Sequence, residues 1–184
     1  MIREEALNLV KEKIQNKNLI NHCLAVEAVM KGMAENFNED TEKWGRAGLL
    51  HDIDYEETKD KPLEHSKIGA EFLKGLGVEE EICQAVLKHN EAHEISPETQ
   101  MEKALLISDP ITGLIVATAL VLPEKKLANV TVENVLNRFK EKGFAKGAKR
   151  EIIAKCESLL NLPLEKFVEI ALTTMKNISN EIGL

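Results

Sequence analysis

The strongest chemical signal in this sequence is the dipeptide His51-Asp52, which follows the apolar run Ala47-Gly48-Leu49-Leu50. We expect Glu42 to Leu50 to form a helix that delivers the imidazole and the carboxylate at or near its C-terminal end. An unpaired charge at the end of a buried helix costs free energy, and a cation bound by both groups would remove that cost. The dipeptide therefore indicates a cation site, although a His-Asp pair by itself is a weak motif.

Three further histidines stand beside apolar positions of expected helices: His22, His65 and His89. Taken singly, each is better explained as a hydrogen-bonded histidine of the core or of a helix cap. Taken together with His51-Asp52, they form a set of imidazoles and carboxylates of the kind that binds first-row transition metals.

Asp109 strengthens this interpretation, because it ends the apolar run Ala104 to Ser108. A carboxylate inside such a helix needs a partner, which is either a metal or a buried cation. Pro110 removes a helical N–H and predicts a kink that would aim the carboxylate into a cleft between helices. The alternative is an ordinary proline kink in a surface helix.

The elements that must position these groups are all predicted to be helices, because apolar residues recur with helical spacing along nearly the whole chain. We expect an all-α fold with helices over residues 6–14, 19–36, 42–50, 62–75, 79–89, 97–121, 131–140, 147–160 and 163–182. Residues 53–61 are rich in charge and predict a loop. Pro62 suits the first position of the next helix, and Ser96 is a candidate cap for the long helix that carries Asp109.

Length, charge and cysteine content narrow the class of protein. The 184 residues suit one domain, and the net charge of −7 argues against general nucleic-acid binding, which needs a basic face. The three cysteines form no CxxC pair, and we expect them to be reduced and buried in a cytoplasmic protein. We see no signal peptide and expect no membrane span, since the longest apolar stretch, residues 111–122, is short.

The pattern resembles the HD superfamily of metal-dependent phosphohydrolases. The elements of its signature, in chain order, are His22, His51-Asp52, His65, His89 and Asp109, and the segment Pro62 to Ala70 is similar to the one that supplies the third histidine in bacterial members. This resemblance implies an HD-domain helical bundle over about 18–122 with a C-terminal helical extension over about 123–184. The whole chain also resembles a group of predicted bacterial and archaeal HD hydrolases without an established substrate, through three segments: residues 51–56, 109–114 and 144–151.

The resemblance also implies the ligands and the reaction. In the version with five histidine and aspartate elements, the family usually binds two divalent transition metals, here Fe, Mn, Co, Ni or Zn. Asp52 would bridge them, with one site completed by His22, His51 and Asp109 and the other by His65 and His89. Metal-activated water would then hydrolyse a small phosphate ester or a nucleotide.

Several other residues are candidates for catalysis or substrate contact. Asp54 stands two residues after Asp52 and could orient a ligand or a water, so we assign it with Asp52 to the catalytic group. The candidates for substrate binding are Glu56, Lys88, His93, Lys149 and Arg150. For each of these, a solvated surface side chain or a salt bridge is the competing explanation. A nucleotide would also need an aromatic ring on which to stack, and the chain offers only Trp44, Tyr55 and five phenylalanines.

Two other functions fit the same ligand set. A diiron oxygenase of this fold would use it to activate dioxygen, and a non-catalytic HD module would use the fold to sense a nucleotide. Metal identity and oxygen dependence would distinguish the diiron oxygenase from a hydrolase. The intact ligand set argues against the non-catalytic module. We expect a small phosphorylated substrate and no membrane partner, and we leave the oligomeric state open.

Overall fold

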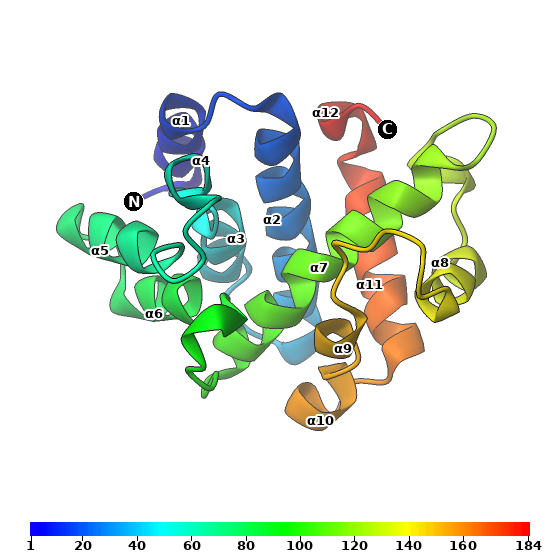
Figure 1. Ribbon diagram of the computed structural model, residues 1–184. Helices are drawn as coiled ribbons and strands as arrows, with labels where there is room; N and C mark the ends of the chain where they lie inside the picture. The colour runs from blue at the N-terminus through cyan, green and yellow to red at the C-terminus, as the bar shows by residue number, and fades with distance from the viewer.

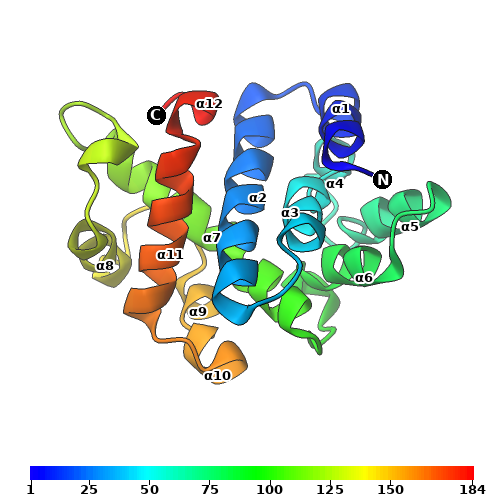
Figure 2. The same cartoon turned by 180° about the vertical axis from the view of Figure 1, so that it is seen from behind.

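Two long helices organise the molecule, α2 (Lys17–Phe37) and α7 (Gln100–Leu120). The computed structural model describes residues 1–184 and contains helices and no strand, in agreement with the expected all-α class. In Figure 1, α7 crosses the middle of the molecule, with α1 to α6 on one side and α8 to α12 on the other. From behind, α2 lies between α3 (Thr41–Leu50) and α11 (Leu164–Asn177) (Figure 2).

Capping side chains fix where the long helices begin and end. The Asn16 side chain accepts from the Asn18 N–H at the start of α2, and Asn38 adopts a left-handed conformation at its end. Helix α7 begins after Thr99, which forms a capping box with Glu102. The expected cap at Ser96 is therefore wrong by three residues, because only Thr99 has the partner Glu102 at the required spacing.

The segment between α3 and α6 (Glu80–Lys88) differs most from the expectation. The predicted loop contains a short helix, α4 (Tyr55–Thr58). The next helix, α5 (Lys67–Gly75), starts five residues later than Pro62. Residues 62–66 instead form turns, in which the Lys61 carbonyl accepts from the N–H groups of Glu64 and His65. His65 consequently lies in a turn before α5 and not within a helix.

The C-terminal part is more broken than periodicity predicted. After α8 (Val132–Lys140), the expected helix over 147–160 is two short helices, α9 (Arg150–Ile153) and α10 (Cys156–Leu160). The expected final helix is interrupted at Ile178 between α11 and α12 (Ser179–Ile182). In both places the apolar pattern continues across a turn, so periodicity alone could not locate the break.

Close approach of α2 and α3 depends on Gly48. A Cβ at this position would lie 2.8 Å from the Val26 carbonyl oxygen and 2.9 Å from the Glu27 nitrogen, both backbone atoms of α2. Since backbone cannot yield as a flexible side chain can, only glycine allows the two helices to pack at this distance. Helix α1 (Arg3–Lys13) adds a partly buried ion pair to the same region, between Arg3 and the buried Glu27.

One core of 47 buried apolar residues draws side chains from both the N-terminal and the C-terminal helices. The three cysteines lie in this core as free thiols, as expected. Helix α7 is long and apolar enough to cross a membrane by length and composition, so the sequence argument that no stretch is long enough does not hold. Most of its apolar window (67%) is nevertheless buried inside the protein.

Candidate metal centre

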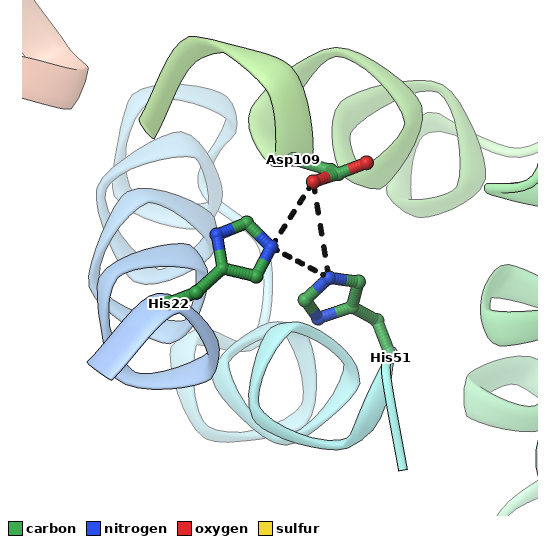
Figure 3. A group of neighbouring side chains, drawn as sticks. All are labelled: His22, His51 and Asp109. Atoms are coloured by element: carbon green, nitrogen blue, oxygen red, sulfur yellow. Dashed lines mark hydrogen bonds and ion pairs between the residues drawn. The ribbon is translucent and has the colours of Figure 1, made fainter. Parts of the chain in front are cut away.

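Three helices bring together the first group of candidate ligands. His22 comes from α2, His51 is the residue that ends α3, and Asp109 projects from α7 (Figure 3). His22 Nε2 lies 3.2 Å from His51 Nε2 and 3.1 Å from Asp109 Oδ1. The Asp109 side chain is 37% exposed and that of His22 is 25% exposed, so this group is reached from solvent.

Asp52 lies at the centre of the cluster, with its two carboxylate oxygens facing different histidines. Oδ2 is 3.4 Å from His51 Nε2 and 3.7 Å from His22 Nε2. Oδ1 is 3.4 Å from His65 Nε2 and 3.6 Å from His89 Nε2. The structure thus brings together all six candidate ligands and places Asp52 between two pairs of imidazoles.

Each of the four imidazoles is held through its other ring nitrogen. His51 Nδ1 donates to the Gly48 carbonyl at 2.8 Å, and His89 Nδ1 donates to the Val86 carbonyl at 2.6 Å. His65 Nδ1 donates to Asp54 Oδ1 at 3.0 Å. These bonds fix a proton on Nδ1 and direct Nε2 towards the cluster, where it can bind a metal in its deprotonated form, which is the usual arrangement of metal-binding histidines.

Thr112 performs the same task for His22. Its hydroxyl donates to the Asp109 carbonyl at 2.9 Å and accepts from His22 Nδ1 at 3.1 Å. Sequence reasoning missed this role. The spacing of Asp109 and Thr112 could have indicated it, because a threonine three residues after an aspartate lies on the same face of a helix.

Burial and charge give the imidazoles of the cluster different proton affinities. Burial lowers the pKa of His51 to about 4, so this ring is neutral at neutral pH. Burial also acts to lower the pKa of His65, but hydrogen bonds and charge from Asp52 and Asp54 outweigh it and raise this pKa to about 9. The pKa of Asp52 is held well below its ordinary value, since the histidines around it outweigh the effect of burial.

The donor set fits divalent transition metals. Two groups of three residues have ligand atoms within 4.8 Å of one another: His22, His51 and Asp109, and then His51, Asp52 and His89. Neutral imidazole nitrogen with carboxylate oxygen suits Mn, Fe, Co, Ni and Zn. The second group contains His51 where His65 was expected, although His65 Nε2 lies close to Asp52 Oδ1.

Asp54 is buried and has both carboxylate oxygens occupied. Oδ1 accepts from His65, and Oδ2 accepts at 2.8 Å from the backbone N–H groups of Ser66 and Gly69. A carboxylate at the start of a helix satisfies N–H groups that have no partner within the helix. Asp54 therefore anchors the first turn of α5 and orients His65, and it makes no contact with the Nε2 side of the cluster.

His93 and Asn90 hold the turn that carries His65. His93 Nε2 donates to the His65 carbonyl at 2.7 Å, and the Asn90 side-chain amide donates to the carbonyls of Pro62 and His65. The expected substrate contact of His93 is thus replaced, in this geometry, by a contact with backbone. Asn90 was not recognised from the sequence, where it looked like an ordinary loop residue.

Two more candidates for substrate contact have partners within the protein. Glu56 accepts from the backbone N–H groups of Gln15 and Asn16 and so ties α4 to the start of α2. Lys88 is buried and pairs with Glu102 at 3.0 Å and with Glu98 at 3.3 Å. Because its charge is matched inside the protein, Lys88 is not available to a phosphate.

The last two candidates, Lys149 and Arg150, are neighbours with different surroundings. All five N–H donors of Arg150 bond to backbone carbonyls of residues 138–148, which leaves none for a substrate. This geometry gives no support to the expected substrate contact of Arg150. Lys149 forms an ion pair with Glu91 and lines a small cavity of about 80 Å³ together with His89 and Asp109.

Two larger cavities meet at His22. One has a volume of about 660 Å³ and is formed by α2, α7 and the C-terminal residues 180–184. The other, of about 570 Å³, lies between α2 and α4. Asn18 and His22 line both, so the cluster opens onto space large enough for a small organic molecule.

Comparison with known proteins identifies the fold and the family. Residues 19–142 match the family described as "HD domain". The chain is 32% identical over 139 residues to ribonuclease Y of Lawsonia intracellularis, covering 74% of this chain and 26% of that protein. It is also 32% identical over 150 residues to an uncharacterized protein of Methanocaldococcus jannaschii, covering 76% of this chain and 85% of the relative.

Solved structures give the same fold. The HD domain of the L. monocytogenes phosphodiesterase PgpH matches with a TM-score of 0.57 and 17% identity, covering 97% of this chain and 99% of that domain. The same domain in complex with cyclic-di-AMP matches with a TM-score of 0.56 and 16% identity. The chain spans only about a quarter of the ribonuclease Y that it matches. The helical architecture, the cluster centred on Asp52 and the match over residues 19–142 lead to one conclusion: the chain belongs to the HD domain family, whose members are generally metal-dependent phosphohydrolases.

Proposed function

We propose that this protein is a metal-dependent hydrolase that cleaves a phosphate ester bond in a nucleotide or another small phosphorylated molecule. The observation that carries the proposal is the position of Asp52, whose two oxygens face two different pairs of imidazole Nε2 atoms. A carboxylate so placed could serve as a ligand for two divalent cations, as in two-metal phosphoesterases.

The chain's own residues prepare the site for this chemistry. Gly48, Val86, Asp54 and Thr112 hold the four imidazoles with their Nε2 atoms inward, so little movement of these side chains is needed when cations bind. When bound, the metals would supply an acidified water and neutralise charge on the phosphoryl oxygens. The partial exposure of Asp109 and His22 leaves one side of the cluster open to the substrate.

Lys149 is the best-placed cation for a contact with the substrate. It lines the small cavity beside Asp109 and His89, and its present partner, Glu91, is on the surface. We propose that a phosphoryl oxygen competes with Glu91 for the ammonium group. Lysine is a common phosphate ligand that acts as a point charge.

The named relatives support a phosphodiester or nucleotide substrate. One is a ribonuclease, and one is a phosphodiesterase whose HD domain was solved with cyclic-di-AMP. The identities are low and the chain is much shorter than ribonuclease Y. The substrates of these two proteins therefore define the first compounds to assay.

The decisive variant is Asp52→Ala, measured beside wild type for metal content and for hydrolysis of a panel of nucleotide monoesters and diesters. We expect the variant to lose both metal and turnover, because it removes the only group that faces both pairs of imidazoles. Asp60→Ala, an exposed aspartate in the same connection, is the matched control and should retain both.

Three results would contradict the proposal. Hydrolysis that survives Asp52→Ala would mean that the site is wrong. Absence of metal after purification and reloading would remove the chemical basis for hydrolysis. Turnover that stops under anaerobic conditions and consumes dioxygen would favour the diiron oxygenase instead.

A further inference from the structure

Aromatic rings near the cluster are scarce, and only one is available to a ligand. Trp44 is buried, and the five phenylalanines are buried or packed against the core. Tyr55, the only tyrosine, is different. Its side chain is 40% exposed, and its ring stands edge-on to that of His65, with centroids 5.2 Å apart and planes at 88°.

Tyr55 lines the cavity of about 570 Å³ between α2 and α4, which also contains His22. The wall on the α4 side is fixed in place, since Glu56 bonds to the backbone at the junction of α1 and α2. The cavity therefore reaches from a candidate metal ligand to an exposed aromatic face within one preformed space.

Besides Tyr55, His22 and Glu56, the cavity is lined by Asn16, Asn18, Lys59 and the aliphatic Leu19. Lys59 is exposed and has no carboxylate within 4.0 Å, unlike Lys88 and Lys149, which are paired. Asn16 and Asn18 add side-chain amides at the same edge. An aromatic face, amide groups and an unpaired cation are the features by which proteins hold a base and the negatively charged backbone that it is attached to.

We propose that this cavity is the subsite for a nucleobase, with the base against the Tyr55 ring and the attached phosphate directed towards His22. The proposal rests on the function proposed above and specifies which part of the substrate the protein recognises. The larger cavity of about 660 Å³, which Val116 and Leu120 line together with polar residues, is a poorer choice, because it contains no tyrosine, tryptophan or phenylalanine ring. Apart from the His22 imidazole, which lines both cavities, it offers a base no ring on which to stack.

The test compares two ligands that differ only in the base, AMP and ribose 5-phosphate. Their dissociation constants are measured by calorimetry on the protein as purified and again after chelation, when no turnover can occur. We expect AMP to bind at least tenfold more tightly than ribose 5-phosphate in wild type. Tyr55→Leu should remove most of this preference, since loss of one stacking ring typically costs about tenfold in affinity, while Tyr55→Phe should keep it.

A matched substitution in the other cavity, Leu120→Ala, should leave the preference unchanged. Lys59→Met should weaken both ligands by a similar factor, because the cation would contact the part that they share. Equal binding of the two ligands by wild type, or a preference that is lost in Leu120→Ala and kept in Tyr55→Leu, would overturn the subsite. An intact preference for AMP without hydrolysis of any phosphate ester would instead contradict the proposed function and leave the subsite standing.

Discussion

The two sides of the Asp52 carboxylate are built in different ways. On the Oδ2 side, His22, His51 and Asp109 project from helices that are long or deeply packed. On the Oδ1 side, His89 likewise follows the last residue of a helix, α6, but His65 lies in a turn held by hydrogen bonds, in which it donates to Asp54 and its carbonyl accepts from His93. Helix packing therefore positions every ligand on the Oδ2 side, whereas the Oδ1 side depends on a polar network for one of its two histidines.

We therefore expect metal binding on the Oδ2 and Oδ1 sides to respond differently to mutation. Helices move only when their packing changes, whereas a turn held by hydrogen bonds is disturbed by loss of a single carboxylate. We expect a substitution on the His65 side to affect one metal and leave the other bound.

The largest effect is expected for His65→Ala. The variant should bind about one metal ion per chain where wild type binds about two, because only the Oδ1 side loses a ligand. Elemental mass spectrometry of the two proteins, purified in parallel, measures the difference. If both contain the same amount, His65 is not a ligand and the two halves are not separate sites.

The next largest effect is expected in the pH dependence of the stability of the metal-free protein. The pKa of His65 is raised from 6.5 to about 9 in the folded protein, so its contribution to stability is fully present below 6.5 and is lost as pH rises through about 9. The free energy of unfolding should fall by up to about 3 kcal/mol over this range. Urea denaturation after chelation, with His65→Gln as the variant that lacks the effect, tests this.

A profile that is flat between pH 6.5 and 9.5 in wild type would contradict the raised pKa. So would an equal fall in His65→Gln, because the proton would then belong to another group.

Asp54→Asn should weaken metal binding on the His65 side by about 10- to 100-fold, the usual cost of losing the partner of a metal-bound histidine. The amide presents an N–H₂ group to a site where both oxygens now accept, so it cannot satisfy all three donors. Metal titration by calorimetry should show one weakened step and one unchanged step. Asp60→Asn is the control, and an unchanged titration of Asp54→Asn would show that the network is dispensable.

The smallest effect is expected for Thr112→Val, which removes the acceptor of His22 Nδ1 but keeps the shape of the side chain. His22 is partly exposed, so water can replace the hydroxyl, and the affinity of the Oδ2 side should fall by less than about tenfold. The same calorimetric titration measures it. A larger loss than in Asp54→Asn would reverse the comparison between the two halves.

Sequence reasoning succeeded where helical periodicity carried the information. It predicted that His51 would end its helix and that Asp109 would point from a long buried helix, and both positions are observed. It failed between residues 53 and 67, where the conformation is set by hydrogen bonds that Asp54 accepts from backbone N–H groups more than ten residues away. No local pattern reveals such partners.

The same limit applies to the candidates for substrate contact. Lys149 and Arg150 are adjacent cations and look equivalent in the sequence, yet one lines a cavity at the cluster and the other is enclosed by carbonyl groups. The difference comes from the path of residues 138–148 around Arg150. Tertiary structure, and not residue type, therefore determines which of the two cations is available to a substrate.

The missing side chain at Gly48 has a consequence for the precision of the whole centre. The separation of α2 and α3 is set there by contact between two backbones, which are the least deformable parts of a protein. The distance between the His22 and His51 side chains follows from this helix separation, and the carbonyl that orients His51 belongs to Gly48 itself. The peptide unit at position 48 thus determines two features of the centre. It sets the distance between the two imidazoles, and its carbonyl sets the rotation of the His51 ring.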